Sequence, residues 1–189
     1  MHDSTRKYDL LTREECLGLM NEAGMLQNIV RHSLEVVKIS LFLTGELNKH
    51  GQDLDLGLVE AASLLHDLTK TKCLQTKEDH AQTAFQLLTR MGYGRIGEVV
   101  AQHVRLSRNG DSSNVSEEEV VNYADKRVQH DQIVSLRERF IDLKERYGKG
   151  PESLRQMEGM ERATFTIEQK IFSILCIDPE NLKDLLAGT

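Results

Sequence analysis

The stretch AASLLHDLTK, residues 61–70, joins an apolar run of helix-forming residues to an adjacent histidine and aspartate, with a lysine one turn later. A helix of this composition is expected to be buried. Burying a neutral polar group without a partner costs about 2–7 kcal/mol. His66 and Asp67 can be tolerated at the end of such a helix if a metal ion takes their lone pairs. The sequence therefore raises the question of which other residues could complete a metal site.

Four further imidazoles and carboxylates lie on separate predicted helices: His32, His80, His103 and Asp125. A helical bundle brings side chains from different helices together in its core. Because adjacent helical residues point about 100° apart, either His66 and Asp67 flank one ion or Asp67 bridges two. Imidazole and carboxylate ligands without thiolates suit Fe, Mn, Co, Ni, Zn or Mg rather than a structural cysteine zinc site. Such an ion binds phosphate oxygens and lowers the pKa of a bound water.

The composition of the chain favours an all-α fold. Only two prolines, no tryptophan and 5% aromatic residues argue against a β-sandwich or barrel, which needs frequent turns and aromatic strands. At 189 residues the chain is long enough for one domain with a core, or a domain with a helical appendage. We expect an N-terminal helical extension over 1–27, a core over 28–147 and C-terminal helices packed on that core over 148–189.

Capping signals and apolar periodicity give the expected helices. Thr12 with Glu15 and Ser116 with Glu119 have capping-box spacing, and Asp55 and Asp79 are suitable N-caps. We predict an irregular connection over 69–77 and a loop over 107–115. The predicted helices are 13–23, 28–50, 56–66, 80–91, 95–104, one from 117 that carries Asp125, 133–147, 151–176 and a terminal one after Asp178.

The ordered residues carry a resemblance to a known family. His32, then His66-Asp67, then Asp125 resembles the H…HD…D signature of the HD-domain metal-dependent phosphohydrolases. The agreement extends to the surrounding stretches VRHSL (30–34), LLHDLTK (64–70) and YADK (123–126). An isolated HD dipeptide carries no information, whereas this ordered set in these contexts is specific. The resemblance covers roughly residues 28–131.

The resemblance implies an HD-domain helical bundle and phosphoester hydrolysis by a metal-activated water. It implies metal ligation by His32, His66, Asp67 and Asp125, and in two-metal members by His80 and His103 as well. This pattern is similar to YqeK-type diadenosine tetraphosphate hydrolases and to HDIG-type cyclic-dinucleotide phosphodiesterases. The latter often carry a second histidine where this chain has Val104, and a GYP element that it lacks. We therefore expect a nucleotide or a simpler small phosphoester as substrate.

The expected catalytic residues are Asp67, His66 and Lys70. Either Asp67 or Asp125 could accept the proton of the attacking water. Lys70 could neutralise a substrate phosphate or orient Asp67. Basic residues near the ligands could form a positive rim for a small anionic substrate. The expected substrate-binding residues are Lys70, Arg105, Lys126 and Arg127, with Arg108 also near the site.

Simpler interpretations remain for several of these features. His66 could be a histidine favoured by the helix dipole, with Asp67 capping the next turn. His130-Asp131 is a second HD dipeptide, which we interpret as non-ligating because no apolar run precedes it. The charged helix 135–147 is typical of a solvated face, or of a homodimer contact. At the level of function, the alternatives are a non-catalytic metal- or nucleotide-binding regulatory module and a plain helical scaffold.

Charge and cysteine content limit the expected partners and location. The formal charge of −6 disfavours a protein that coats nucleic acid, because phosphates would be repelled. Three scattered cysteines without a CxxC pair indicate free thiols in a reducing compartment. No secretory signal and no long apolar stretch is visible, so we expect a cytoplasmic protein without a membrane span.

Overall fold

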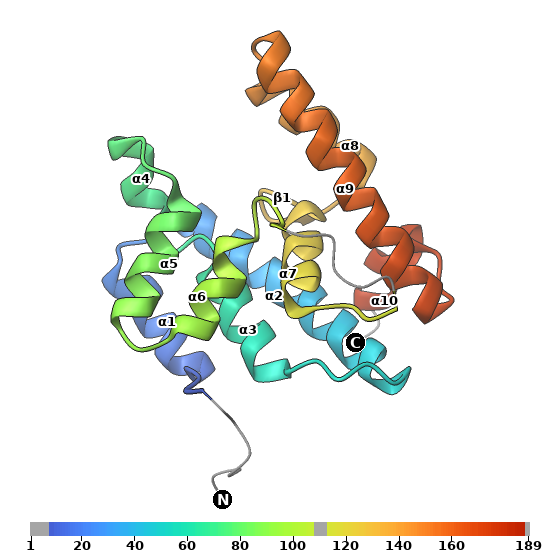
Figure 1. Ribbon diagram of the computed structural model, residues 1–189, viewed down its shortest axis with the longest axis horizontal. Coiled ribbons are helices and arrows are strands. Elements are labelled where there is room, and N and C mark those ends of the chain that lie inside the picture. Colours follow the sequence, from blue (N-terminus) through green and yellow to red (C-terminus); the bar gives the residue numbers. More distant parts are fainter. Residues whose placement is uncertain (1–7, 108–112, 188–189) are drawn as a thin grey trace, which may run out of the picture.

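The computed structural model describes residues 8–107 and 113–187. Within these residues the fold is all-α, as the sequence predicts, apart from one short antiparallel hairpin (Figure 1). The elements are α1 (Arg13–Glu22), α2 (Gln27–Lys49), α3 (Leu56–Leu65), α4 (Lys70–Thr76), α5 (His80–Arg90), α6 (Gly94–Ala101), α7 (Glu117–Lys126), β1 (Val128–Gln129), β2 (Gln132–Ile133), α8 (Leu136–Tyr147), α9 (Pro151–Leu175), a 3₁₀ turn (Pro179–Asn181) and α10 (Leu182–Ala187).

The predicted caps form at the starts of the helices. Thr12 and Ser116 each complete a capping box, which fixes the first turns of α1 and α7. The side chains of Asp55 and Asp79 accept backbone N–H groups at the starts of α3 and α5. Because four orphan N–H groups begin every α-helix, these caps fix where the ligand-bearing helices begin.

Two connections differ from the prediction. Residues 70–76 form α4 rather than an irregular segment, because Cys73 is buried there and Thr69 donates its hydroxyl to the carbonyl of His80. The helix predicted from 133 begins only at 136, because the hairpin β1–β2 occupies the preceding residues and Ser135 caps the later start. The predicted loop 107–115 and Arg108 lie partly or wholly outside the described residues.

The core forms around α2 and α3. Helix α3 packs against α1, α2, α6 and α7, and its apolar side chains from Leu58 to Leu65 are fully buried. A helix that is apolar around its whole circumference is stable only where other helices cover every side. This burial holds the last turn of α3 rigidly in the middle of the molecule (Figure 1).

Helices α5 and α6 pack unusually closely, at Gly97. A Cβ atom at this position would lie 3.1 Å from both a ring carbon and the carbonyl oxygen of Phe85. The missing side chain therefore lets the backbone of α6 approach the backbone of α5. His80 begins α5 and His103 follows α6, so this contact sets the relative position of the two histidines.

The C-terminal helices both complete the core and extend beyond it. The second half of α9 buries Ile167, Ile171, Phe172 and Leu175 against the core, while α8 and the first half of α9 project away from α3 (Figure 1). Lys170 of α9 bonds the buried carboxylate of Glu119 at 2.8 Å. None of the described helices combines the length and the apolar character that a membrane crossing needs.

Candidate metal centre

His66 and Asp67 immediately follow the buried helix α3. Their side chains are at most 1% exposed, and the chain turns tightly there, with Lys70 N–H donating to the Asp67 carbonyl. The turn then leads directly into α4. The sequence places this pair at the end of a buried helix, and the structure does the same.

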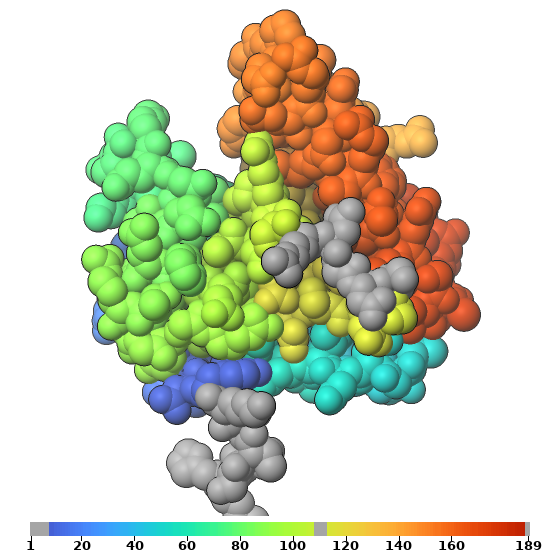
Figure 2. All heavy atoms as spheres, in the orientation of Figure 1, coloured from blue at the N-terminus to red at the C-terminus, as the bar shows by residue number. Residues whose placement is uncertain are grey.

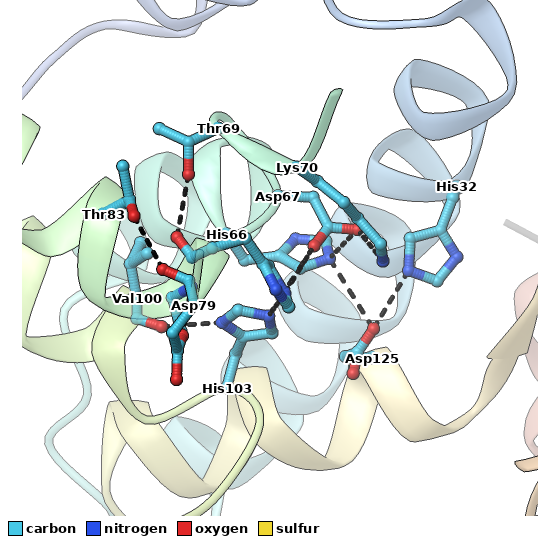
Figure 3. Close-up of polar contacts among 12 residues, drawn as sticks. His32, His66, Asp67, Thr69, Lys70, Asp79, Thr83, Val100, His103 and Asp125 are labelled. Atoms are coloured by element: carbon cyan, nitrogen blue, oxygen red, sulfur yellow. Dashed lines mark hydrogen bonds and ion pairs between the residues drawn. The ribbon is translucent and has the colours of Figure 1, made fainter. Parts of the chain in front are cut away.

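The other predicted ligands converge on this pair from separate helices (Figure 3). His80 Nε2 lies 3.3 Å from Asp67 Oδ1, and His103 Nε2 lies 3.7 Å from the same oxygen. On the other side, His66 Nε2 lies 3.6 Å from Asp125 Oδ1. His32 Nε2 lies 3.0 Å from that same oxygen of Asp125. The structure therefore brings all six predicted metal ligands together.

Five of the six residues form two groups that share Asp67. His32, His66 and Asp67 each offer a ligand atom within 4.8 Å of the others, and so do Asp67, His80 and His103. In Figure 3, Asp67 lies between His32 and His103. This arrangement suits two cations with Asp67 between them. His103 follows α6 rather than lying on it as predicted, because the helix ends at Ala101 in tighter i→i+3 bonds.

Backbone carbonyls fix the orientation of three of the imidazoles. In each, Nδ1 lies within 3.0 Å of a carbonyl oxygen, in the pairs His66–Ser63, His103–Val100 and His32–His130. A carbonyl only accepts hydrogen bonds, so Nδ1 carries a proton and Nε2 is the atom through which each ring could bind a metal. The Nε2 atoms of His32 and His66 face the carboxylates of the cluster.

Two buried atoms of the cluster lack a hydrogen-bond partner among the described residues: His66 Nε2 and Asp67 Oδ1. Buried polar atoms are normally bonded, and an unbonded one calls for an explanation such as an ion. Both atoms belong to residues of the two groups, and the donor set is imidazole and carboxylate only. The residues present therefore fit divalent metal ions.

The charges of the cluster also favour metal binding. Burial by itself would raise the pKa of Asp67, but His66 and Lys70 outweigh it and hold that pKa well below its usual value. Asp125 is likewise held low against burial, by Lys126 and His32. Burial lowers the pKa of His103 to about 3. These three groups are thus in the unprotonated form that a metal requires at neutral pH.

A family model described as the HD domain matches residues 29–136, which is more than half of the chain. The chain belongs to the HD-domain family. No curated protein and no solved structure gave a significant match. The HD domain suggests metal-dependent phosphohydrolase activity in general and binding of divalent metals. The match ends at the first residue of α8.

Lys70 of this HD-domain chain directly contacts the cluster of six candidate ligands, called the metal cluster below. Its Nζ donates to Asp67 Oδ2 at 2.6 Å, and its side chain is 36% exposed. Burial lowers the pKa of Lys70, but the carboxylate of Asp67 more than compensates, so that the pKa is raised. Lys70 therefore carries a positive charge between the buried carboxylate and the surface.

The other three basic residues that we expected to bind substrate lie in three different surroundings. Lys126 is 4% exposed, and its Nζ bonds Asp125 Oδ2 and the His103 carbonyl oxygen, each at 2.7 Å. Arg127 points away from the cluster. Its guanidinium bonds Glu168 and the carbonyl oxygens of Val134 and Pro179, so the prediction that it binds substrate finds no support in its position.

Arg105 lies beside a different cavity. It donates to Gln156 Oε1 at 2.8 Å and lines a cavity of about 260 Å³ between the segment after α6 and the middle of α9. That cavity does not include any of the six predicted ligands. Arg105 therefore does not share a cavity with the six predicted ligands, and its position does not support the predicted role in substrate binding.

A cavity of about 330 Å³ opens onto the metal cluster. His80, His103 and Asp125 line one side, and side chains of α8 and α9 line the other, including Arg139, Leu143, Tyr147, Met157 and Met160. Sequence reasoning missed the three of these residues that lie on α8, because it interpreted 135–147 as a solvated face or a homodimer contact. The available signal was the four-residue spacing of Arg139, Leu143 and Tyr147, which places them on one helix face.

The second HD dipeptide, His130-Asp131, contacts the candidate site through the backbone of His130. The carbonyl oxygen of His130 faces Nδ1 of His32, whereas the His130 ring accepts a bond from Arg146. Asp131 pairs with Arg31 on the surface. Among the described residues, neither side chain belongs to the two candidate metal groups.

Proposed function

We propose that this HD-domain protein is a metal-dependent phosphohydrolase that cleaves a nucleotide or a related small phosphoester. The observation that carries the proposal is the cluster of six imidazoles and carboxylates around Asp67. Its unbonded buried atoms are suited to bind a cation, and the cluster opens into a cavity of small-molecule size.

The residues divide between two proposed metal sites. His32, His66, Asp67 and Asp125 would hold one divalent ion, and Asp67, His80 and His103 would hold a second. When bound, these ions supply a Lewis acid that polarises a phosphoryl oxygen and lowers the pKa of water. The backbone bonds at Nδ1 hold three of the rings in the orientation that this ligation needs.

The chain itself supplies proton acceptors and positive charge. Asp67 and Asp125 are ionised, so a carboxylate oxygen of either can accept the proton of an attacking water. Lys70 can neutralise a phosphate oxygen as it enters, since it is partly exposed and already lies at the carboxylate of Asp67. Lys126 is a positioning residue, because its ammonium group is bonded to Asp125 and to the His103 backbone.

The presence of both His80 and His103 supports a relative of the YqeK-type two-metal hydrolases. The modest volume of the cavity supports a mononucleotide or simple phosphoester over a cyclic dinucleotide. The three cysteines are free thiols, which supports action in the reducing cytoplasm.

The test combines metal analysis with a substrate panel. Protein purified without oxygen should contain stoichiometric divalent metal and should release phosphate from nucleotides or other phosphoesters in Mn²⁺, Fe²⁺ or Co²⁺. His66→Ala and Asp67→Ala should each reduce turnover to background while leaving the helical circular dichroism nearly unchanged. The control is His50→Ala, which removes an exposed histidine just after α2.

Three results would contradict the proposal. Full turnover in His66→Ala or Asp67→Ala would remove the cluster from the mechanism. Nucleotide binding without product would favour a regulatory module instead. Absence of metal from the purified protein would favour a helical scaffold whose histidines are ordinary core residues.

A further inference from the structure

One face of α8 is directed at the metal cluster, although the HD-domain match ends where this helix begins. Arg139, Leu143 and Tyr147 recur every four residues and therefore lie on the same side of the helix. All three line the cavity that contains His80, His103 and Asp125. They also line a smaller cavity of about 140 Å³ on the side of His32 and Asp67, together with Lys70.

Arg139 is bonded on one side only. Its Nη1 donates to Asp142 Oδ2 at 2.9 Å, and its side chain is 12% exposed. Its Nε is buried and has no hydrogen-bond partner among the described residues. A guanidinium carries five N–H donors, and an edge of two adjacent donors matches two oxygens of a phosphate. The edge that includes Nε is thus unsatisfied beside the cavity.

Apolar side chains surround the outer part of the same cavity. Leu143, Met157 and Met160 form its wall. Leu74 and Tyr147 also line the cavity and are 53% and 55% exposed, so they lie at its mouth. Figure 2 shows the surface hollowed between the green side of α4 and α5 and the orange tip of α8 and α9. Exposed apolar side chains around a polar floor are typical of a ligand site.

We propose that Arg139 binds the phosphate of the substrate and that Tyr147 contacts its organic group. The substrate class is a small phosphomonoester with a planar, largely apolar group, such as a nucleoside monophosphate. The floor of the cavity provides positive charge from Lys70 and Arg139, whereas the mouth provides an aromatic ring on which a base can stack. This inference rests on the proposed function, which makes phosphate and nucleoside the two products.

A purely structural role for Arg139 predicts something different. In that case its pairing with Asp142 would stabilise α8, and its loss would lower stability without altering ligand affinity. The two products of hydrolysis separate these roles, because neither is turned over. Inorganic phosphate tests Arg139, and adenosine tests Tyr147.

Calorimetric titration of the metal-loaded full chain with inorganic phosphate tests the first contact. Arg139→Met should weaken phosphate binding about tenfold or more, since it removes a charge-assisted hydrogen bond. Arg139→Lys should restore part of the affinity, because it keeps the charge but not the two-donor edge. Arg137→Met is the matched control, because Arg137 is an exposed arginine on the same helix. The metal content of all variants should be unchanged.

Titration with adenosine tests the second contact. Tyr147→Ala should weaken adenosine binding about fivefold or more and leave phosphate binding unchanged, because stacking of a base on an aromatic ring is lost. Ile141→Ala is the control, since Ile141 is 54% exposed on α8 and does not line the cavity. Both residues are exposed, so neither substitution should unfold the protein.

The outcomes distinguish this inference from the proposed function. Phosphate binding by Arg139→Met within about twofold of the parent, or no binding by the parent, overturns the role of Arg139. Equal adenosine binding by Tyr147→Ala and the parent overturns the substrate class. If both affinities fall as expected but no phosphoester is hydrolysed, the ligand contacts stand and the hydrolase proposal fails.

Discussion

Lys126 acts on the candidate centre through the residues that it bonds. The sequence suggested that this lysine binds substrate, because it follows the last predicted ligand. Its ammonium group instead bonds the carboxylate of Asp125 and the backbone of His103, and little of it is exposed. One side chain therefore connects a ligand of the first proposed ion to a ligand of the second.

We predict that Lys126→Met lowers the affinity for divalent metal about 10- to 100-fold, because partners that orient metal ligands commonly contribute this much. Metal titration of the purified variant measures the effect. Lys170→Met is the control, since Lys170 bonds Glu119, another buried carboxylate of α7. The control should lose stability and keep its metal affinity. An unchanged affinity in Lys126→Met would show that Asp125 needs no such partner.

The identities of the candidate ligands were predictable from the sequence, but their orientation was not. Order and context pointed to His32, His66-Asp67 and Asp125, and in the structure His32 lies 3.0 Å from Asp125 and His66 lies 3.5–3.6 Å from Asp67 and Asp125. The acceptors that orient the rings are backbone carbonyls, which every residue type possesses. No sequence pattern can therefore reveal them.

Among the helices, prediction succeeded where a cap marks the start. The caps at Thr12, Ser116 and Asp79 have side-chain signatures, and α1, α7 and α5 begin where they indicate. Prediction failed for α4 and for the hairpin, which depend on tertiary contacts. It also failed for the cavity-facing side of α8, because a charged helix shows the same residue types whether it faces solvent or a ligand.

The close approach of α5 and α6 at Gly97 gives a prediction about the second proposed ion. Gly97→Ala adds a methyl group against the carbonyl oxygen of Phe85, so α6 must shift by a few tenths of an ångström. That shift moves His103 relative to His80, whose Nε2 atoms now lie 3.1 Å apart. Metal ligation tolerates about 0.2 Å. We expect about tenfold weaker binding of the second ion, with about 1 kcal/mol lost in stability.

A two-site metal titration checks this effect. Gly45→Ala is the control, because a Cβ there meets no atom within 4 Å and Gly45 lies in α2, the helix that carries His32. The control should raise the free energy of unfolding by about 0.5–1 kcal/mol and leave both metal affinities unchanged. Equal metal binding in Gly97→Ala and the parent would mean that α6 absorbs the methyl group without moving His103.

Across the chain, Arg127 connects the HD-domain core to the C-terminal helices. The guanidinium, whose side chain is 3% exposed, bonds Glu168 of α9 and the carbonyl oxygen of Pro179 before α10. Tyr123 of α7 also donates to Glu168, at 2.7 Å. The α8–α9 region that faces the metal cluster is therefore attached at its base by a buried polar network.

We predict that Arg127→Met lowers the free energy of unfolding by about 3 kcal/mol, because it leaves the partly buried carboxylate of Glu168 without its cation. Chemical denaturation of the metal-free protein measures the loss. The double variant Arg127→Met with Glu168→Gln should be less destabilised than Arg127→Met alone, since no uncompensated charge remains. Equal losses in the two variants would show that the pairing with Glu168 contributes little.

Lys126 and Arg127 are neighbours in sequence, but their side chains point in different directions. Lys126 bonds the candidate ligand Asp125, whereas Arg127 bonds Glu168 of the C-terminal helix α9. An activity screen would record a defect at both positions and would group them as a single basic motif. Measuring both expression yield and metal occupancy would distinguish the two positions, because the Lys126 variant should lose metal and the Arg127 variant should lose yield. Excess divalent metal should restore the activity of Lys126→Met, whose defect is in metal binding. Lower temperature should restore the activity of Arg127→Met, whose defect is in stability.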